Sequence, residues 1–455
     1  MKPCARRPKV ILVPYPAQGH VTPMLRLASI LYSHGFDPVL VTPEFIHRRI
    51  SPSVNPAAGA GEVITFLPIP DGSGTSDSVP HDFFSIEKAM EDVMPVHLER
   101  LVNELDVADN GVALMVVDLL ASFAIEVGNR CGVPTTGFWP AMLATYKLVA
   151  AIPELVREGH ISDCGIPQKE SEIRQNPSLT TQDLPWLIGP VNARKARFRF
   201  WTRALHRSAS LRWLLVNSFS EEDDEAEIQC FRDYPTIVPI GPLTNPSPLT
   251  KNTSFWEEDA TCLTWLKNQE PDSVIYVSFG SWVSPIGRDK VASLALSLES
   301  TRRPFLWVLG PSWREGLPHG FLERVRSRGR VVSWAPQVEV LRDRAVGCYL
   351  THCGWNSTVE AVQCGRRMLC WPVAGDQFVN CKYIVEAWRV GVRMAGFGER
   401  EVEDGVKRLM EDGEMGERLA ELKERMMMAK ANSRKVANMA GFVEDLRRIT
   451  EDDSL

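Results

Sequence analysis

A group of polar side chains follows one short apolar run in the second half of the chain. The segment Cys348–Gly365 reads CYLTHCGWNSTVEAVQCG, in which a predicted strand is followed by a glycine-containing turn and a helix that begins near Trp355. A strand-turn-helix junction directs backbone N–H groups and the positive end of the helix dipole at one point, where a phosphate binds well. His352, Asn356 and Ser357 bring hydrogen-bond donors to that point. These residues therefore predict an anion site for a phosphate group.

Glu360 lies on the same predicted helix, four residues after Asn356 and three after Ser357. This spacing places its carboxylate on the same helical face one turn deeper, where it could accept hydrogen bonds from ribose hydroxyls. Residues 357–360 also fit a capping box, in which a serine and a glutamate satisfy the first N–H groups of a helix. The spacing alone leaves both interpretations open.

A histidine and an aspartate follow two apolar runs in the first half of the chain. His20 comes after residues 9–14 (KVILVP) and opens a predicted helix, and Asp118 ends the run 112–117. The carboxyl ends of parallel strands meet at one edge of a sheet, where α/β proteins keep their sites. An imidazole with an ordinary pKa of about 6.5 can act as a general base near neutral pH, and a carboxylate can orient it. A histidine at this place could equally serve only as a hydrogen-bonding group at the helix start.

The pattern around these residues predicts an α/β protein with two doubly wound parallel sheets. Short apolar runs alternate with helical patterns over residues 9–138 and again over 273–371, as in sheets covered by helices on both faces. Residues 239–252, rich in Pro, Ser, Thr and Asn, form the predicted linker. We expect one domain over residues 1–245, a second over 250–430, and a helix over 431–455 that returns to the first domain.

Composition excludes several classes of partner. The 455 residues are 24% charged and 44% hydrophobic with a formal net charge of -6, so we expect neither nucleic acid nor an anionic membrane as a partner. No run of 18 or more apolar residues predicts a membrane span.

The first residues lack a signal-peptide pattern and the ten cysteines lack paired spacing, so we expect a cytoplasmic protein with reduced thiols. Of the sequons at Asn252 and Asn356, the second lies within the predicted phosphate site, where a glycan would block binding.

Other kinds of site find less support in the sequence. Four cysteines and one histidine could suggest zinc, but their spacing matches no standard tetrahedral pattern, and they are Cys348, His352, Cys353, Cys364 and Cys370. No G-x-S-x-G segment follows a predicted strand, which argues against a serine hydrolase. Residues 334–377 contain no Asp-x-Asp pair that would hold Mg²⁺ against a diphosphate. We therefore expect no metal site.

Residues 334–377 resemble the 44-residue signature box of plant-type UDP-dependent glycosyltransferases, which belong to glycosyltransferase family 1. The segment opens with WAPQ, continues through HCGWNS and Glu360, and closes on WP and DQ. The resemblance to this family extends through most of the chain and includes PAQGH at 16–20, FWP at 138–140, VNS at 216–218, IGPL at 240–243 and YVSFGS at 276–281. The resemblance implies an α/β fold of GT-B type, with two facing Rossmann-like doubly wound domains and a cleft between them.

The resemblance also assigns one set of residues to the UDP-sugar donor: Ser281, Trp334, Ala335, Gln337, His352, Gly354, Trp355, Asn356, Ser357, Glu360, Asp376 and Gln377. A lone tryptophan is more often a core residue, but the box implies that Trp334 stacks on uracil and that Gln337 bonds to uracil or ribose. The polar residues near the predicted turn would hold the diphosphate, with Ser284 as a further candidate, and Glu360 would take the ribose hydroxyls. Trp355, Asp376 and Gln377 would line the sugar.

The implied function is inverting transfer of a sugar from a UDP-sugar to a hydroxyl of a small hydrophobic acceptor. His20 would remove the acceptor proton with assistance from Asp118, and Gln377 at the end of the box implies glucose. We expect no cofactor apart from UDP-glucose as co-substrate, and a monomer. The alternatives are a UDP-sugar hydrolase or epimerase, or a non-catalytic UDP-sugar-binding protein.

Two short segments depart from the family pattern. Where Gly-Val-Pro is common, this chain has Gly365-Arg366-Arg367, and residues 373–375 (VAG) stand where an aromatic residue is frequent. We expect Arg366 and Arg367 to be solvated surface charges. Residues 152–168 and 185–199 are expected to shape the acceptor site, but their sequence specifies no molecule.

Overall fold

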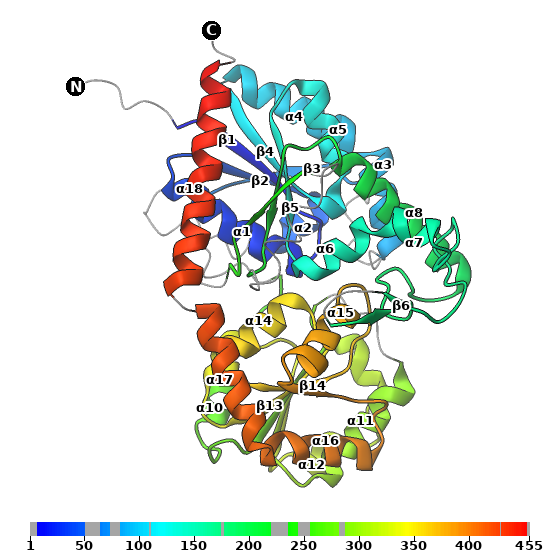
Figure 1. Cartoon of the computed structure of the whole chain (residues 1–455). Helices are drawn as coiled ribbons and strands as arrows, with labels where there is room; N and C mark the ends of the chain where they lie inside the picture. The colour runs from blue at the N-terminus through cyan, green and yellow to red at the C-terminus, as the bar shows by residue number, and fades with distance from the viewer. Residues whose placement is uncertain are drawn as a thin grey trace, which may run out of the picture. The chain divides into compact units, whose positions relative to one another are not determined.

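The computed structural model describes residues 7–50, 64–72, 82–108, 111–173, 177–219, 235–243, 255–281, 287–427 and 429–452 (Figure 1). The chain divides into two compact units. The first combines residues 1–150, 199–255 and 429–455, and the second combines 151–198 and 256–428. Most of the predicted linker, from residue 244 onward, and the phosphate candidate Ser284 lie outside the described residues.

The first unit is built on a seven-stranded parallel sheet with the order β3-β2-β1-β4-β5-β8-β9. Its strands are β1 (Lys9–Val13), β2 (Asp37–Pro43), β3 (Thr65–Ile69), β4 (Val112–Asp118), β5 (Thr135–Trp139), β8 (Trp213–Val216) and β9 (Thr236–Pro239). The strand order reverses between β1 and β4, which pair with Val13 opposite Val117. Such a reversal opens a crevice at the carboxyl ends of the two strands.

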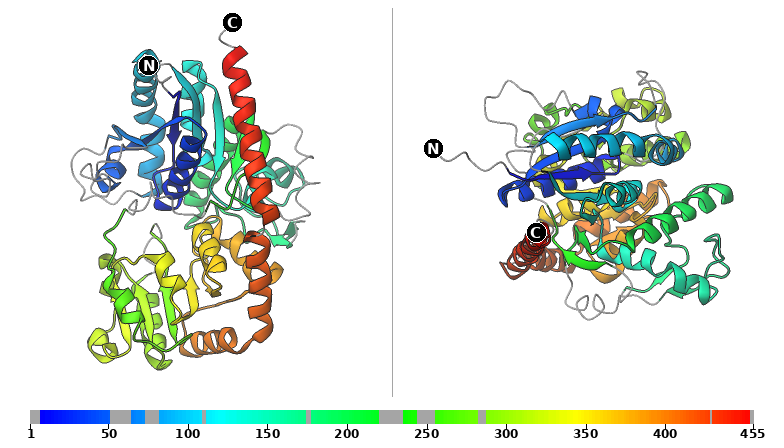
Figure 2. Two further views of the ribbon diagram at one scale, coloured as in Figure 1. Left: turned by 90° about the vertical axis from the view of Figure 1, so that its left-hand side faces the viewer. Right: turned by 90° about the horizontal axis from the view of Figure 1, so that it is seen from above.

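The helices of the first unit are α1 (Gln18–Ser33), α2 (Glu44–Ile50), α3 (Phe83–Asp92), α4 (Met94–Ala108), α5 (Phe123–Cys131), α6 (Leu143–Ala150), the part of α8 (Val191–Ser208) from residue 199 onward, and α18 (Ala429–Asp452). Both views of Figure 2 show α18 beside this unit, although it comes last in the sequence. The Phe442 ring on α18 packs edge-on against Trp213 of β8, and the Asn438 amide donates to the Pro239 carbonyl at 2.7 Å. Among the described residues, no helix combines the length and apolar character needed to cross a membrane.

The second unit contains a six-stranded parallel sheet with the order β12-β11-β10-β13-β14-β15. Its strands are β10 (Val274–Ser278), β11 (Phe305–Val308), β12 (Gly329–Val332), β13 (Val346–Thr351), β14 (Arg367–Cys370) and β15 (Gly391–Arg393). Its helices are α7 (Ile152–Arg157), α10 (Thr261–Leu266), α11 (Arg288–Ser300), α12 (Phe321–Val325), α13 (Gln337–Arg342), α14 (Trp355–Gln363), α15 (Gln377–Lys382), α16 (Glu399–Glu411) and α17 (Gly413–Met427). A short antiparallel pair, β6 (Glu172–Ile173) with β7 (Leu179–Thr180), also belongs to it. The predicted class of two doubly wound α/β domains is therefore confirmed.

The two faces of the second sheet have different roles. One face packs against α11, α12 and α16 through a hydrophobic cluster that includes Ile275 and Val277 of β10 and Leu350 of β13. Because successive strand residues point to opposite faces, Tyr276 and Tyr349 lie on the other face. That face carries the polar residues described below.

Arg366 and Arg367 do not form the solvated charges that the sequence predicted. The Arg366 guanidinium donates to the carbonyls of Leu341 at 2.7 Å and Asp343 at 2.9 Å, and its side chain is only 13% exposed. Arg367 donates to the Leu409 carbonyl. These carbonyls lie at the C-terminal ends of α13 and α16, where the last carbonyls of a helix lack partners within the helix. The expectation was wrong because two helix ends bind these charges.

Candidate active site

His20 and Asp118 meet at the crevice of the first sheet. His20 is the third residue of α1, directly after β1, and Asp118 ends the neighbouring strand β4. The imidazole Nδ1 lies 2.7 Å from Asp118 Oδ2; the histidine side chain is 22% exposed and the aspartate is completely buried. The other carboxylate oxygen accepts the Leu120 N–H at 2.9 Å, which fixes the carboxylate. The sequence-predicted pair is thus brought together, with a held carboxylate and a partly exposed ring.

The corresponding crevice of the second sheet holds His352. This residue follows β13, and the neighbouring strand β10 leads into Gly280 and Ser281. A Cβ atom added to Gly280 would come within 2.6 Å of His352 Nε2, and one added to Gly354 within 2.5 Å. Gly280 also has a φ of 75°, which a residue with a side chain adopts only at a cost. The imidazole therefore lies between Gly280 and Gly354, and a side chain at either position would crowd it.

Burial determines the protonation state of His352. The residue is 8% exposed, and burial lowers its pKa from 6.5 to about 4, against a smaller opposing effect of a hydrogen bond with the Ser278 backbone. The ring is therefore neutral at physiological pH and can donate one hydrogen bond.

The start of α14 lies directly after this histidine. Gly354 is the N-cap, and Trp355, Asn356 and Ser357 form the first turn. Trp355 is 4% exposed, Ser357 is 7% exposed and Asn356 is half-buried. The N-terminus of this nine-residue helix, with the positive end of its dipole, is suited to an anion.

Ser357 and Glu360 do not form the capping box that their spacing allowed. They occupy the third and sixth positions of α14, and each accepts a hydrogen bond from the side-chain amide of Gln337. The Gln337 Nε2 atom lies 3.0 Å from Ser357 Oγ and 2.9 Å from Glu360 Oε2. Three sequence-predicted residues from two helices are thereby joined in one network.

The side-chain oxygen of Gln337 is held by two residues that the sequence analysis did not select. Tyr276 on β10 and Tyr349 on β13 donate to Gln337 Oε1, at 3.3 Å and 3.1 Å. Both tyrosines lie within apolar strands, so their sequence context resembles that of ordinary core residues. Their roles become visible only when the strand register is known.

Asp376 and Gln377 lie at the start of α15. Gln377 Oε1 accepts the N–H groups of Val373 and Ala374, each at 2.9 Å, so its oxygen holds the preceding turn. Asp376 Oδ2 accepts a hydrogen bond from Asn380 Nδ2 at 2.8 Å. Asn380, which the sequence analysis did not select, also donates to the Cys353 carbonyl at 2.9 Å and so connects α15 to the His352 turn.

Trp334 lies just before α13, and Ala335, which follows it, is buried. The Trp334 ring is half-buried, and its centroid lies 6.1 Å from that of Trp256, whose side chain is partly exposed. The Trp334 carbonyl accepts the Asp259 N–H at 3.1 Å. An anchored, partly exposed indole can stack on a planar ring.

The cysteine and histidine set considered from the sequence does not come together. Within the described part of the chain, the sulfur atoms of Cys353, Cys370 and Cys381 lie within 4.8 Å of one another, and all three residues are buried. Only the first two belong to the earlier set, and Cys381 comes from α15. The sequence spacing could not reveal this grouping because it depends on where α15 packs.

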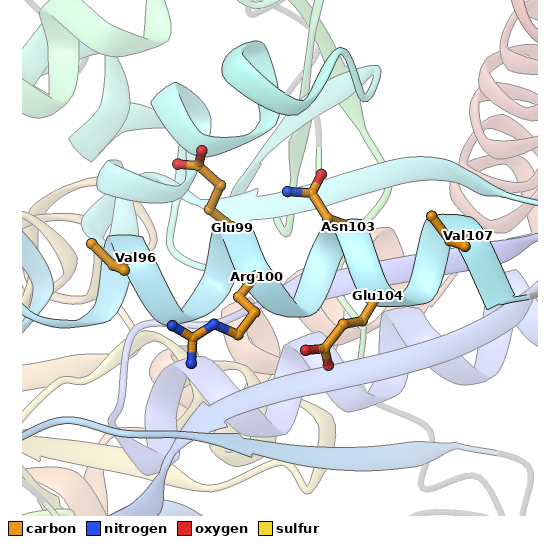
Figure 3. A pocket seen from close by; sticks show the side chains of 6 residues that line it. All are labelled: Val96, Glu99, Arg100, Asn103, Glu104 and Val107. Atoms are coloured by element: carbon orange, nitrogen blue, oxygen red, sulfur yellow. The ribbon is translucent and has the colours of Figure 1, made fainter.

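A shallow pocket on the exposed side of α4 is shown in Figure 3. Its lining comes from this one helix and consists of Val96, Glu99, Arg100, Asn103, Glu104 and Val107. None of the sequence-predicted site residues is among them. Val107 is 89% exposed, so this pocket does not enclose a ligand.

Comparison with known proteins identifies the family. The sequence model described as "UDP-glucoronosyl and UDP-glucosyl transferase" matches residues 225–426. UDP-glycosyltransferase 82A1 of Arabidopsis thaliana is 56% identical over 446 residues, which cover 93% of this chain and 95% of that protein. The chain therefore belongs to the UDP-glycosyltransferase family. It is a UDP-dependent glycosyltransferase, which transfers sugar from a UDP-sugar to a small-molecule acceptor.

Solved structures agree with this assignment at the level of the fold. A UDP-glucose:anthocyanidin 3-O-glucosyltransferase in complex with UDP has a TM-score of 0.82 at 22% identity, covering 98% of this chain and 100% of the other. A UDP-glucosyltransferase from Polygonum tinctorium, capable of glucosylating indoxyl and solved with 3,4-dichloroaniline, has a TM-score of 0.78 at 27% identity, covering 97% and 99%. The fold is accordingly of the GT-B type.

Proposed function

We propose that this glycosyltransferase inverts the anomeric centre of UDP-glucose and uses His20 as the general base. The observation that carries the proposal is the 2.7 Å contact between His20 Nδ1 and Asp118 Oδ2 at the carboxyl ends of β1 and β4. An acceptor hydroxyl is a weak nucleophile until its proton is removed, and a positioned imidazole can remove it. With Nδ1 facing the carboxylate, Nε2 is the nitrogen that accepts this proton.

The proposed reaction is a single displacement. As the acceptor oxygen attacks the anomeric carbon, His20 Nε2 takes its proton, and the bond between that carbon and the diphosphate oxygen breaks. UDP leaves with the electron pair, and Asp118 stabilises the imidazolium that forms. An α-linked donor then yields a β-linked product.

The donor would bind to the second unit. Trp334 would stack on uracil beside Ala335, Gln337 would contact uracil or ribose, and Glu360 would accept hydrogen bonds from the ribose hydroxyls. The residues for the diphosphate are at the carboxyl ends of β10 and β13 and the start of α14: Ser281, His352, Gly354, Asn356 and Ser357. Because the lowered pKa keeps His352 neutral, the helix N-terminus and backbone N–H groups would provide much of the positive potential.

Asp376, Gln377 and Trp355 would line the sugar. The oxygen of Gln377 accepts two backbone N–H groups, which leaves its amide nitrogen as the group to donate to a sugar hydroxyl. Gln377→Glu keeps a carbonyl oxygen for the turn but removes these donors, whereas Gln377→Ala removes both. We expect both variants to lower turnover of UDP-glucose strongly. Full activity of Gln377→Glu, or equal use of several UDP-sugars by the wild type, contradicts the glucose assignment.

The acceptor is proposed to be a small hydrophobic molecule with a hydroxyl group. A related enzyme glucosylates indoxyl, a compact aromatic alcohol. A mass-spectrometric screen of phenolic, terpenoid and hormone-like alcohols with UDP-glucose identifies the acceptor class. Proton NMR of the purified product then tests the mechanism, because inversion requires a β linkage and an α product contradicts it. If the enzyme releases glucose from UDP-glucose without an acceptor as fast as it transfers glucose to one, the activity is that of a hydrolase.

A further inference from the structure

Tyr276 and Tyr349 form a buried pair behind the proposed ribose site. They face each other across β10 and β13 as register partners, and their rings stack with centroids 4.9 Å apart and an interplanar angle of 26°. Their exposed fractions are 1% and 0%. Buried hydroxyls need hydrogen-bond partners, and both of these donate to the same atom, Gln337 Oε1.

These hydrogen bonds determine which way the Gln337 amide faces. With Oε1 held by two phenols, Nε2 faces α14 and donates to Ser357 and Glu360. Burial raises the pKa of Tyr349 to about 12 and that of Tyr276 well above 10. Both phenols therefore keep their protons near neutral pH and act as donors.

The opposite amide orientation would be unfavourable at this site. A reversed Gln337 would present its oxygen to the Glu360 carboxylate, and two acceptors cannot form a hydrogen bond with each other. It would also turn its NH₂ group toward the phenols. The Glu360 carboxylate thus excludes the reversed amide, and the two phenols hold the remaining orientation by donating to Oε1, which keeps Nε2 directed at Glu360.

We propose that Tyr276 and Tyr349 are positioning residues for recognition of the donor ribose, acting through the Gln337 amide on the Glu360 carboxylate. This inference rests on the proposed role of Glu360 as the ribose ligand. Neither tyrosine needs to touch the nucleotide. Their contribution is to limit the Glu360 carboxylate to one orientation, so that it is ready for the ribose hydroxyls before the donor binds.

The test measures ribose recognition separately from general donor affinity. Dissociation constants for UDP and 2′-deoxy-UDP are measured by calorimetry for the wild type, Tyr276→Phe, Tyr349→Phe and the double variant. The preference for UDP is the dissociation constant of 2′-deoxy-UDP divided by that of UDP. Each single change removes one hydrogen bond to Gln337, so we expect this ratio to fall about three- to tenfold and the KM for UDP-glucose to rise by a similar factor. The kcat should stay within about twofold, because these residues do not act on the acceptor proton. The double variant should lose most of the preference.

Two matched variants complete the test. Tyr146→Phe removes the hydroxyl of another fully buried tyrosine, in the first unit, and should leave the preference unchanged. Gln337→Leu removes the amide through which the tyrosines act; because Gln337 is also a proposed uracil or ribose contact, this variant should lose at least as much of the preference as the double variant, and a Gln337→Leu protein that keeps the preference overturns the inference even where a tyrosine variant does not fold. An equal loss of affinity for both nucleotides indicates a purely structural role and overturns the inference, as does an unchanged preference.

Glu360→Ala separates this inference from the proposed function. If this variant abolishes the preference for UDP while the tyrosine variants keep it, positioning by the pair is wrong and the role of Glu360 stands. If Glu360→Ala itself keeps the preference, the ribose role of Glu360 is wrong and the inference fails with it.

Discussion

The two sheets place a histidine at the same point of the same fold but give it different surroundings. His20 stands at the crevice of the first sheet with a partly exposed ring and a buried carboxylate 2.7 Å away. His352 stands at the crevice of the second sheet, is 8% exposed, and fits between Gly280 and Gly354. A doubly wound sheet therefore fixes where a histidine lies, while its immediate neighbours decide what it can do.

The difference matters because the two proposed roles make opposite demands on an imidazole. A general base must gain a proton during the reaction, and the adjacent Asp118 stabilises the cation that results. A ligand for the diphosphate must stay in one protonation state and one position. Burial meets the demand on the protonation state, because it lowers the pKa of His352 to about 4, and the backbone at Gly280 and Gly354 lies close to the ring.

The largest effect short of removing a histidine is expected from crowding His352. Gly280→Ala and Gly354→Ala each place a methyl group within 2.6 Å of Nε2. Overpacking of this kind costs about 1 to 3 kcal/mol, so displacement of the ring should weaken UDP binding about ten- to a hundredfold. Calorimetric titration with UDP measures the change.

Gly365→Ala is the matched control for Gly280→Ala. Gly365 has a φ of 67°, close to the 75° of Gly280, but a Cβ atom there would meet nothing within 4 Å. It therefore carries the backbone strain without the crowding and should bind UDP as the wild type does. Equal loss in the two variants would assign the effect to backbone strain.

The burial of His352 also predicts how stability depends on pH. Its pKa is lowered from 6.5 to about 4 in the folded chain, so between these values the unfolded chain binds a proton that the folded chain does not. The free energy of unfolding should therefore be highest above pH 6.5 and fall as the pH decreases toward 4, with about 3 kcal/mol from this residue.

Urea unfolding at a series of pH values measures this dependence. Comparison with His352→Gln, whose side chain does not titrate, isolates the contribution of the one residue. The variant should show a flatter profile between pH 6.5 and 4. Parallel profiles for the two proteins would show that His352 is not the buried, neutral group described here.

Asp118→Asn should act on His20, and its effect should be smaller than that of crowding His352. Asparagine has one carbonyl oxygen in place of the two carboxylate oxygens that contact His20 and the Leu120 N–H, and its neutral amide no longer stabilises the imidazolium. We expect kcat to fall about tenfold, because the loss of one charge-assisted hydrogen bond costs about 1.5 kcal/mol. Steady-state kinetics at saturating acceptor measures this, and a fall as large as that of His20→Ala would show that the carboxylate does more than assist.

Chelation should have no effect at all. Donors from the α14 terminus and His352 are proposed to hold the diphosphate where other enzymes use Mg²⁺. Turnover of UDP-glucose should therefore be equal with and without EDTA. Activity that is lost with EDTA and restored by Mg²⁺ or Mn²⁺ would show that the diphosphate needs a cation.

Much of this arrangement could be predicted from the sequence, because parallel strands bring their carboxyl ends to one edge. That rule placed His20 near Asp118, and it also placed the His352 turn directly before the start of α14. The periodicity of the apolar runs was sufficient for both sheets. These features depend on local pattern and on strand direction.

The remaining features depend on contacts between segments that are distant in the sequence. Tyr276 and Tyr349 look like core residues of apolar strands until the register pairs them below Gln337. Arg366 looked like a surface charge because its carbonyl partners near α13 lie more than 20 residues earlier. The grouping of residues 151–198 with the second unit likewise follows from packing rather than from any local signal.

The most direct test of the different roles compares His20→Ala with His352→Ala in one set of measurements. For each variant, kcat with UDP-glucose and the dissociation constant of UDP are determined at the same pH. We predict that His20→Ala lowers kcat on the order of 10²-fold or more with UDP affinity unchanged, whereas His352→Ala weakens UDP binding. A His20→Ala enzyme that keeps its kcat, or that loses UDP affinity as much as His352→Ala does, would contradict the account.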